Sequence, residues 1–325
     1  MQPLAGVSVL DLTRLLPGGL CSLILADLGA DVLKIEEPGR GDYLRAFPPL
    51  GHTQSALFTA LNRGKRSITI NLKSEAGCAL LLDLVRRADV LLEGFRPGVL
   101  ERLGVGYDVL HDANPRLIVC AISGYGQAGP LRDRVGHDLN YLGYAGALPL
   151  FAPRGGGLPI VPGLQIADLG GGALTAAVGI LAALLERGRT GQGQVLDIAM
   201  TDGVLHWLAA LAAEQWATGA VPPGGRGPLS GGCACYSVYA TADNRALTVA
   251  AVEGRFWANL CRMIEREAFV PLQYAAWPEQ ERMFADLNHL FASRTLAEWM
   301  EFFGDAEVCV GPALMLAEAL ELHAD

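Results

Sequence analysis

The sequence has few of the features that mark secreted, membrane-bound or nucleic-acid-binding proteins. Residues 1–4 carry no basic segment of the kind that begins a signal peptide, so we expect no leader and a cytoplasmic protein. The longest apolar stretch, residues 170–185, is too short and too rich in glycine for a membrane span and predicts a buried helix. With 25 basic and 34 acidic side chains, the formal net charge is −9, which argues against nucleic acid as a partner.

Cysteine gives no sign of a disulfide framework or of a metal site. The seven cysteines are odd in number and form no C-x-x-C pair, and the closest spacing is that of Cys233 and Cys235. No histidine lies near these two in the sequence. We therefore expect reduced thiols and no metal.

The composition is that of a globular protein with a sizeable core. Hydrophobic residues make up 51% of the 325 residues and charged residues 18%. This length is enough for one large α/β domain and a smaller one.

The first two thirds of the chain alternate short apolar runs with helical patterns, which predicts a mostly parallel sheet covered on both faces. The expected strands are residues 7–10, 31–35, 67–71, 90–93, 117–122 and 194–198. The expected helices are residues 17–28, 74–87, 170–187 and 199–217, with Ser74 as the N-cap of the second.

Residues 221–228 are rich in proline and glycine and are the best linker in the chain. Beyond them, two alternating runs predict an antiparallel hairpin with its turn at residues 243–244. We therefore predict a large domain over residues 1–220, to which residues 310–325 return, and a small α+β domain over residues 221–309. The hairpin strands are residues 236–241 and 246–252, and the helices of the small domain are residues 256–266, 278–292 and 295–303.

One match to a nucleotide-binding motif is discarded. Residues 124–129 fit G-x-G-x-x-G and follow an expected strand, but the dinucleotide fingerprint needs a helix that opens at the last glycine. Pro130 and a polar run stand there instead. The segment is predicted to be a loop.

The segment 136–141 places His137 beside Asp138 at the expected start of a helical stretch. A histidine is the side chain best suited to exchange protons near neutral pH. In the alternative interpretation, His137 only caps the helix and Asp138 accepts hydrogen bonds from its free N–H groups.

Two further carboxylates are candidates. Asp168 precedes three consecutive glycines and a long apolar helix, and glycines leave room for a ligand to approach the backbone. Glu253 stands at the end of an apolar strand. The alternatives are an N-cap for Asp168 and a first-turn helix carboxylate for Glu253.

Basic residues gather early in the sequence, which in an acidic protein suggests a site for a polyphosphate ligand. The alternative is an ordinary solvated face. The residues concerned are Arg63, Lys65, Arg66, Lys73, Arg96 and Arg102.

Seven blocks of the sequence, taken together, resemble the class III CoA-transferase family. They come in the order found in that family and lie within residues 6–257, and the resemblance as a whole extends from residue 4 to about residue 317. The blocks are GVSVLDLTRLLPGGLCSLILADLGADVLKIEEPGRGD, NRGKRSITINLKS, ADVLLEGFRPGVLERLG, SGYGQAGP, GHDLNY, ADLGGGALTAAVGILAALLERGRTGQGQVLDIAMTDG and YSVYATADNRALTVAAVEGRFW. The GHDLNY block resembles the α-methylacyl-CoA racemase branch, because transferases commonly carry another residue, often tyrosine, where His137 stands.

The resemblance implies two-domain subunits with a Rossmann-like large domain, interlocked as a homodimer. It matches His137 and Asp168 to the acid/base pair of the racemases, and Glu253 to the glutamate that supports the histidine. It matches Asp138 to the nucleophile of the transferases. The implied CoA contacts are Asn71, Leu72, Lys73, Gly94, Phe95, Arg96, Arg102, Gly136, Asn140 and Tyr141.

Three positions depart from the family pattern. Glu37 stands where the racemases would carry a basic residue for a CoA phosphate, and Gly254 stands where proline is usual. Family members also continue beyond the position of Asp325 with a stretch that helps to finish the large domain.

The favoured hypothesis is a racemase or epimerase of 2-methylacyl-CoA thioesters that works by 1,1-proton transfer through an enolate, with acyl-CoA as substrate and no metal or redox cofactor. Backbone N–H groups near Asp138 are expected to bind the enolate oxygen. The second hypothesis is a CoA-transferase in which Asp138 attacks the acyl-CoA carbonyl. The third is a CoA-binding protein without catalysis.

Overall fold

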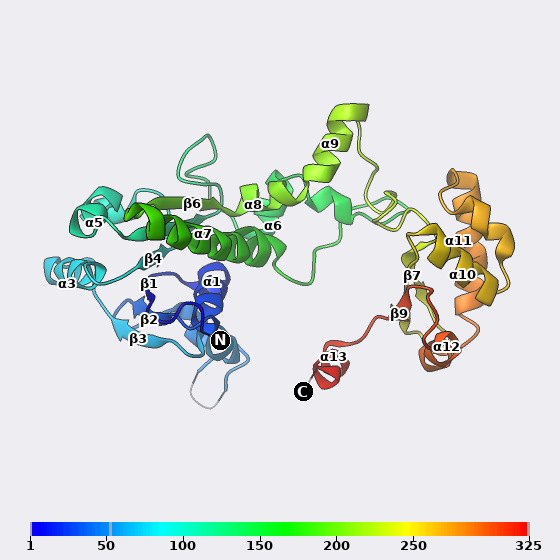
Figure 1. Cartoon of the computed structure of the whole chain (residues 1–325), viewed down its shortest axis with the longest axis horizontal. Coiled ribbons are helices and arrows are strands. Elements are labelled where there is room, and N and C mark those ends of the chain that lie inside the picture. Colours follow the sequence, from blue (N-terminus) through cyan, green and yellow to red (C-terminus); the bar gives the residue numbers. More distant parts are fainter. Residues whose placement is uncertain (1, 52–53, 324–325) are drawn as a thin grey trace. The chain divides into compact units, whose positions relative to one another are not determined.

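The computed structural model describes residues 2–51 and 54–323, which form two compact units (Figure 1). The first unit comprises Met1–Leu148 and Val161–Ala212, and the second comprises Pro149–Ile160 and Ala213–Asp325. Each unit has a hydrophobic core of its own. The intertwined homodimer concerns a partner chain and stays a prediction.

A six-stranded parallel sheet forms the centre of the first unit, as predicted, with the order β3-β2-β1-β4-β5-β6. Each pair of neighbours is parallel. This is the strand order of Rossmann-like folds, and the order reverses between β1 and β4. The strands are β1 (Ser8–Asp11), β2 (Asp31–Glu36), β3 (Arg66–Thr69), β4 (Val90–Glu93), β5 (Ile118–Ser123) and β6 (Val195–Ala199).

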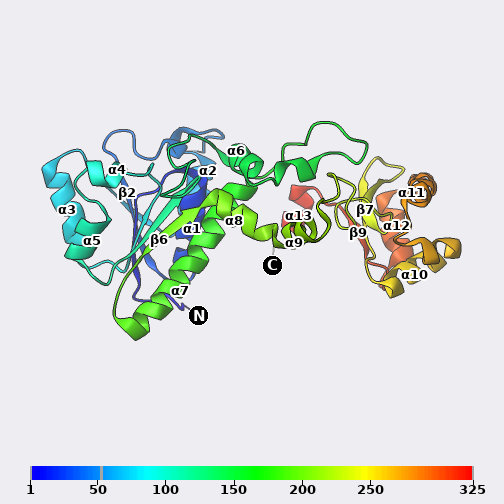
Figure 2. The same ribbon diagram turned by 90° about the horizontal axis from the view of Figure 1, so that it is seen from above.

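Helices cover both faces of this sheet. In Figure 2, α1 and α7 lie on one side of it and α3 and α5 on the other. The helical segments are α1 (Leu15–Asp27), η1 (Tyr43–Ala46), α2 (Ala56–Asn62), α3 (Glu75–Val85), α4 (Val99–Arg102), α5 (Tyr107–Ala113), α6 (Asp138–Tyr144), η2 (Leu148–Phe151), η3 (Ala167–Leu174), α7 (Thr175–Thr190), α8 (Met200–Trp207) and α9 (Ala209–Thr218).

The apolar runs of the strands explain this double layer. Successive side chains of a strand point to opposite faces of the sheet. Val9 and Val90 therefore belong to the core beneath α1 and α7, whereas Leu10 and Leu91 belong to the core beneath α3 and α5. Strands that are apolar at every position thus require helices on both sides.

Several local predictions are confirmed. Ser74 caps α3, because its Oγ accepts a hydrogen bond from the N–H of Gly77 at 3.1 Å. Residues 124–137 form the predicted loop between β5 and α6. The short helices α2 and α5 carry no long apolar period and were not predicted.

The second unit contains the predicted hairpin. Strands β7 (Tyr236–Ala240) and β8 (Ala246–Ala250) pair antiparallel, and Asn244 takes a left-handed conformation with φ of 58° at the turn. Helices pack on this sheet around the buried side chains of Trp257 and Trp299. They are α10 (Gly254–Met263), η4 (Glu267–Leu272), α11 (Trp277–Phe291) and α12 (Leu296–Phe303).

The prediction that residues 310–325 return to the large domain is wrong for the described residues 310–323. Strand β9 (Val310–Pro312) pairs with β8 and extends the small sheet. Helix α13 (Leu316–Leu322) is tied to the same sheet by an ion pair of 2.7 Å between Arg245 and Glu318. Residues 149–160 and 213–220 also belong to the second unit and not to the first.

The longest apolar helix runs from η3 into α7. By length and composition alone, Ala167–Thr190 could cross a membrane, a test that core helices also pass. The side chains of Ala176, Ile180 and Ala183 are buried against the sheet, while Val178 and Leu185 are exposed. The prediction that this helix is buried is therefore confirmed for the face that packs against the sheet, whereas the opposite face is exposed.

Helix α8 touches η3 backbone to backbone. A Cβ atom added at Gly203 would lie 2.1 Å from the carbonyl oxygen of Gly171, and one added at Gly171 would lie 2.5 Å from the carbonyl oxygen of Met200. No residue with a side chain fits at either position without moving the two helices apart.

We expect Gly203→Ala to destabilise the protein by about 1–3 kcal/mol, the usual cost of overpacking a core. The matched control is Gly188→Ala in α7, where an added Cβ meets nothing within 4 Å. That change should leave stability equal or raise it by up to about 1 kcal/mol. Urea unfolding followed by circular dichroism checks both, and equal stabilities of the two variants would contradict the packing argument.

Candidate active site

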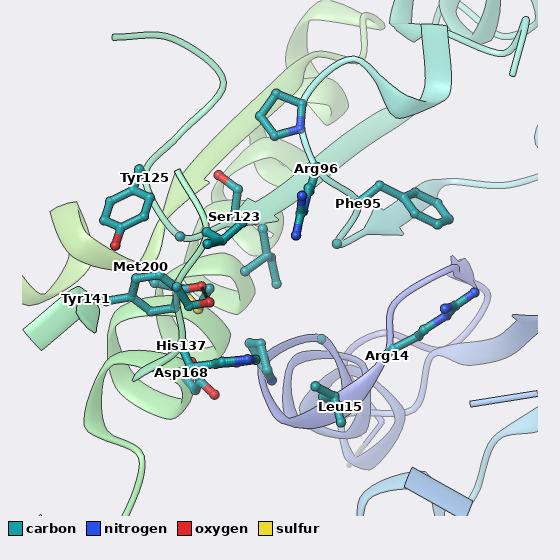
Figure 3. A pocket seen from close by; sticks show the side chains of 18 of the residues that line it. Arg14, Leu15, Phe95, Arg96, Ser123, Tyr125, His137, Tyr141, Asp168 and Met200 are labelled. Carbon is teal, nitrogen blue, oxygen red and sulfur yellow. Dashed lines mark hydrogen bonds between the residues drawn. The ribbon is translucent and has the colours of Figure 1, made fainter. Parts of the chain in front are cut away.

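The carboxyl ends of β1, β4 and β5 open into a cavity of about 770 Å³ (Figure 3). It lies where the strand order reverses, the place at which open α/β sheets bind their ligands. Three loops that directly follow strands line it. They are Thr13–Arg14 after β1, Gly94–Arg96 after β4 and Gly124–Tyr125 after β5.

A second cavity of about 340 Å³ adjoins the first at the ends of β1, β2 and β3. The side chains that line both cavities form a common wall. These shared residues are Leu12, Thr13, Arg14, Phe95 and Val99. A ligand with two chemically different parts can therefore occupy both cavities at once.

The structure brings most of the predicted site residues to these two cavities. Gly94, Phe95, Arg96, Gly136, His137, Asn140, Tyr141 and Asp168 line the larger one. Asn71, Leu72, Lys73 and Phe95 line the smaller one. Asp138 and Arg102 line neither. Glu253 belongs to the second unit, where it is the N-cap residue of α10.

His137 is the N-cap residue of α6, so the capping interpretation is correct for its backbone. Its N–H group donates a hydrogen bond of 3.1 Å to Oδ1 of Asn140. Among the residues that the structure describes, none forms a hydrogen bond with its imidazole. The ring is exposed to the cavity and is free to act on a ligand.

Asp168 lies in the first turn of η3, a π-helical segment of the kind that often occurs at functional sites. The N-cap is Ile166, so the alternative interpretation of Asp168 as an N-cap is wrong. Burial, and secondly the nearby charge of Asp138, raise the pKa of Asp168 to about 7. At neutral pH this carboxyl group is present in both protonation states.

Asp138 joins the two elements that carry these side chains. Its Oδ1 accepts a hydrogen bond of 2.9 Å from the backbone N–H of Asp168. The start of α6 is thereby fixed against the start of η3. In Figure 3 the side chains of His137 and Asp168 lie next to each other at the same end of the cavity.

The three glycines after Asp168 serve packing and not ligand approach. All three are buried, and a Cβ added at Gly170 would lie 1.7 Å from the ring of Trp207. The expectation that these glycines leave room for a ligand to approach the backbone is therefore wrong, because α8 occupies the space beside them.

Aromatic packing fixes the loop before α6. The hydroxyl group of Tyr141 donates a hydrogen bond of 2.5 Å to the carbonyl oxygen of Gly136. Tyr125 packs edge-on against Tyr141, with ring centroids 5.2 Å apart. Sequence reasoning missed Tyr125, although its place directly after a buried strand was a usable signal.

The early basic residues separate into two groups. Lys65 is buried 3.6 Å from a carboxylate oxygen of Asp11, and Arg63 and Arg66 form exposed ion pairs with Asp27 and Asp31. These three side chains are used within the fold. Of the predicted cluster, only Lys73 and Arg96 line the cavities.

Arg14 and Glu37 form an ion pair of 2.7 Å at the smaller cavity. Both side chains are about 40% exposed, so the pair contributes little to stability. Glu37, the residue that departs from the racemase pattern, is therefore neutralised by a neighbouring cation. Arg14 was not singled out in the sequence.

Comparison with known proteins places these features in a family. The model of CoA-transferase family III matches residues 4–324. The chain is 39% identical over 321 residues to alpha-methylacyl-CoA racemase from Homo sapiens, which covers 98% of this chain and 79% of that protein. It is 37% identical over 328 residues to acetyl-CoA:oxalate CoA-transferase from Acetobacter aceti, covering 98% and 83%. A CAIB/BAIF family protein from Brucella suis has the same fold, with a TM-score of 0.84 at 30% identity, covering 99% and 86%.

We expect the carboxyl group of Asp168 to titrate near pH 7 in the folded protein. Asp138→Asn removes a charge that raises this pKa, so the midpoint should fall, although burial will keep it above the ordinary range. Carbon-13 NMR of the carboxyl carbons, assigned with Asp168→Asn, measures the midpoint. The control is Asp133→Asn, an exposed carboxylate at the same cavity that does not contribute to the shift. A midpoint near 4, or one unmoved by Asp138→Asn, would contradict this electrostatic account.

Proposed function

Because the chain belongs to CoA-transferase family III, we propose that it inverts the configuration of 2-methylacyl-CoA thioesters by moving a proton at the α-carbon. The observation that carries the proposal is the presence of His137 and Asp168 on one cavity. Inversion at the α-carbon requires two groups that can each take up or release a proton, one on each face of that carbon.

The α-proton of a thioester is a weak acid, so the base and the charge acceptor must act together. We propose that one of the pair removes the α-proton, that the electron pair of the broken C–H bond forms a double bond to the carbonyl carbon, and that the π pair of the carbonyl moves to the thioester oxygen, which gives the enolate. The other group then delivers a proton to the opposite face. The roles of His137 and Asp168 exchange with the configuration of the substrate. The step as written needs no metal and no redox cofactor.

The environment of Asp168 suits this work. A proton-transfer group is most effective when its pKa lies near the working pH. Burial raises the pKa of Asp168 to about 7, so the carboxyl group can both take up and give back a proton. The N–H groups of Asp138 and Leu139 make no hydrogen bond within the described residues, so they are available to donate hydrogen bonds to the enolate oxygen.

The two cavities suggest how the substrate is divided. We propose that the acyl group and the thioester occupy the larger cavity, beside His137 and Asp168. The CoA portion would then pass Phe95 into the smaller cavity, where Lys73 is available for phosphate. The supporting role of Glu253 and the homodimer remain part of this proposal.

A CoA-transferase is the second candidate, because a transferase from Acetobacter aceti is almost as similar as the human racemase. The sequence predicted Asp138 as the nucleophile of that mechanism, but the geometry favours Asp168. Asp138 does not line the cavity, and one of its oxygens accepts a hydrogen bond from the N–H of Asp168. In the transferase alternative, the carboxylate of Asp168 would attack the thioester carbonyl and CoA thiolate would leave, giving a mixed anhydride.

We expect rapid exchange of the α-hydrogen of a 2-methylacyl-CoA with D₂O when no acceptor acid is present. His137→Ala and Asp168→Asn should each reduce this exchange by about 10²–10⁴-fold, the usual contribution of a general acid or base. Asp138→Asn keeps an oxygen that can accept the N–H of Asp168 and should retain most of the exchange. Proton NMR of the substrate follows the loss of the α-hydrogen.

The same experiment separates the two candidates. A transferase would show no exchange without an acceptor acid, would tolerate His137→Ala, and would yield an Asp168 hydroxamate when hydroxylamine is added during turnover. That combination would rule out the racemase assignment.

A further prediction concerns the arginine side chains that could bind the phosphates of CoA. Arg96 lines the larger cavity directly after Phe95, which lines both cavities, so we place it where the CoA portion would leave the larger cavity for the smaller one. A charge-assisted contact with a CoA phosphate contributes about 1.5–3 kcal/mol, so Arg96→Ala should weaken CoA binding about tenfold or more. The control is Arg116→Ala, at the opposite end of β5, where the side chain bonds the carbonyl of Gly191. Calorimetry that shows weaker binding in Arg102→Ala but not in Arg96→Ala would reverse the assignment of these two arginines.

A further inference from the structure

Glu93 is a buried carboxylate beneath the wall shared by the two cavities. It is the last residue of β4 and only 2% exposed. Its Oε2 accepts a hydrogen bond of 2.6 Å from the backbone N–H of Phe95, and its Oε1 accepts one of 2.7 Å from the hydroxyl group of Tyr107 in α5. Glu93 itself lines neither cavity.

The turn that Glu93 holds is part of both cavities. Phe95 lines the larger and the smaller one, and Arg96 lines the larger one. The turn follows the strand at which the sheet order reverses, and among the described residues no backbone carbonyl accepts a hydrogen bond from the N–H of Phe95. The carboxylate supplies this bond instead, and through Tyr107 it connects the turn to α5.

We propose that Glu93 is a positioning residue: its carboxylate holds the Gly94–Arg96 turn in the conformation that binds the CoA thioester, and so sets the affinity for it. This inference rests on the proposed function, because it takes the ligand that contacts the common wall of the two cavities to be a CoA thioester. It adds a residue that touches no substrate but determines where Phe95 and Arg96 lie.

The protonation state of Glu93 should therefore affect binding. Burial is the largest cause that raises the pKa of Glu93, to about 7, and the charges of Glu101 in α4 and Asp197 in β6 raise it further. The hydrogen bonds from Tyr107 and from the N–H of Phe95 oppose the shift. Cys120 of β5 is a further titratable group near this carboxylate, because the charge of Glu93 contributes to the raised pKa of its thiol.

Proton uptake weakens the hold on the turn. An ionised carboxylate accepts both hydrogen bonds, and bonds to a charged acceptor are about twice as strong as neutral ones. A protonated Glu93 must donate to the oxygen of Tyr107 and keeps only a neutral bond to Phe95. Below pH 7 the turn is therefore held less firmly, and affinity for the thioester should fall as the pH falls.

One effect works in the opposite direction. The negative charge of Glu93 repels the phosphates of CoA, so its loss would strengthen binding. For phosphates that lie more than about 8 Å from the carboxylate, salt screens this repulsion, so its effect on the affinity for CoA is small. Loss of charge assistance in one hydrogen bond changes it by roughly fivefold. The positioning effect should prevail.

Calorimetric titration with CoA between pH 5.5 and 8.5 tests the proposal on the wild-type chain and on Glu93→Gln. Glutamine imitates the protonated acid, because it can donate to Tyr107 and accept from Phe95. At each pH, the ratio of the two dissociation constants cancels the effect on affinity of the titration of CoA itself and of all groups that the two proteins share. We expect the variant to bind about as well as the wild type at pH 5.5 and about fivefold more weakly at pH 8.5.

Two further variants distinguish positioning from a merely structural role. Tyr107→Phe removes a hydrogen bond that favours the ionised form, so the midpoint of the pH dependence should move up. Glu101→Gln removes a like charge, so the midpoint should move down. Circular dichroism confirms that each variant folds, and the opposite shifts of this pair test the proposal even if Glu93→Gln does not fold.

The outcomes separate this inference from the proposed function. If the wild type does not bind CoA at any pH, the proposed function fails, and the ligand named here fails with it. If CoA binds but the ratio stays near one at every pH, or binding strengthens as Glu93 is protonated, the positioning role is overturned and the proposed function is not.

Discussion

The reversal of strand order between β1 and β4 is the constraint on which the site depends. The chain places β2 and then β3 on one side of β1. It then returns along the other face of the sheet and places β4 on the other side of β1. The loops after these two adjacent strands therefore separate and leave an opening. Thr13 and Arg14 form one side of it and the turn held by Glu93 forms the other. Because the strands are apolar on both faces, helices must cover both faces of the sheet. The chain crossings that this requires also leave the cavity at the carboxyl ends of β1 and β4.

Two carboxylates with different environments, Asp138 and Asp168, lie beside this opening. Asp138 accepts a hydrogen bond from the N–H of Asp168 and fixes the start of η3, while burial, and secondly the charge of Asp138, raise the pKa of Asp168 to about 7. The close packing of Gly171 and Gly203 holds η3 in place from behind. Asp138 therefore positions Asp168 and raises its pKa, and of these two carboxylates only Asp168 lines the larger cavity with His137.

The sequence was sufficient for the large-scale architecture, because unbroken apolar strands separated by helices allow few other arrangements. It was insufficient where function depends on which loops meet. Arg14 and Tyr125 lie far apart in the chain, and only the sheet order brings them to one cavity. The glycines after Asp168 were interpreted as open to a ligand, since the sequence does not reveal that α8 packs on them. Strand β9 has only three residues and no pattern of its own, so its pairing with β8 was not predictable.

The central claim is that one of His137 and Asp168 removes the proton from one face of the α-carbon and the other delivers a proton to the opposite face. The most direct measurement is the incubation of a single epimer of a 2-methylacyl-CoA in D₂O with the wild-type protein and an added carboxylic acid, followed by chiral chromatography and mass spectrometry. The account predicts an equal mixture of the two epimers, each with one deuteron at the α-carbon, and the added acid unchanged. Retained configuration without deuterium, together with CoA transferred to the added acid, would contradict it.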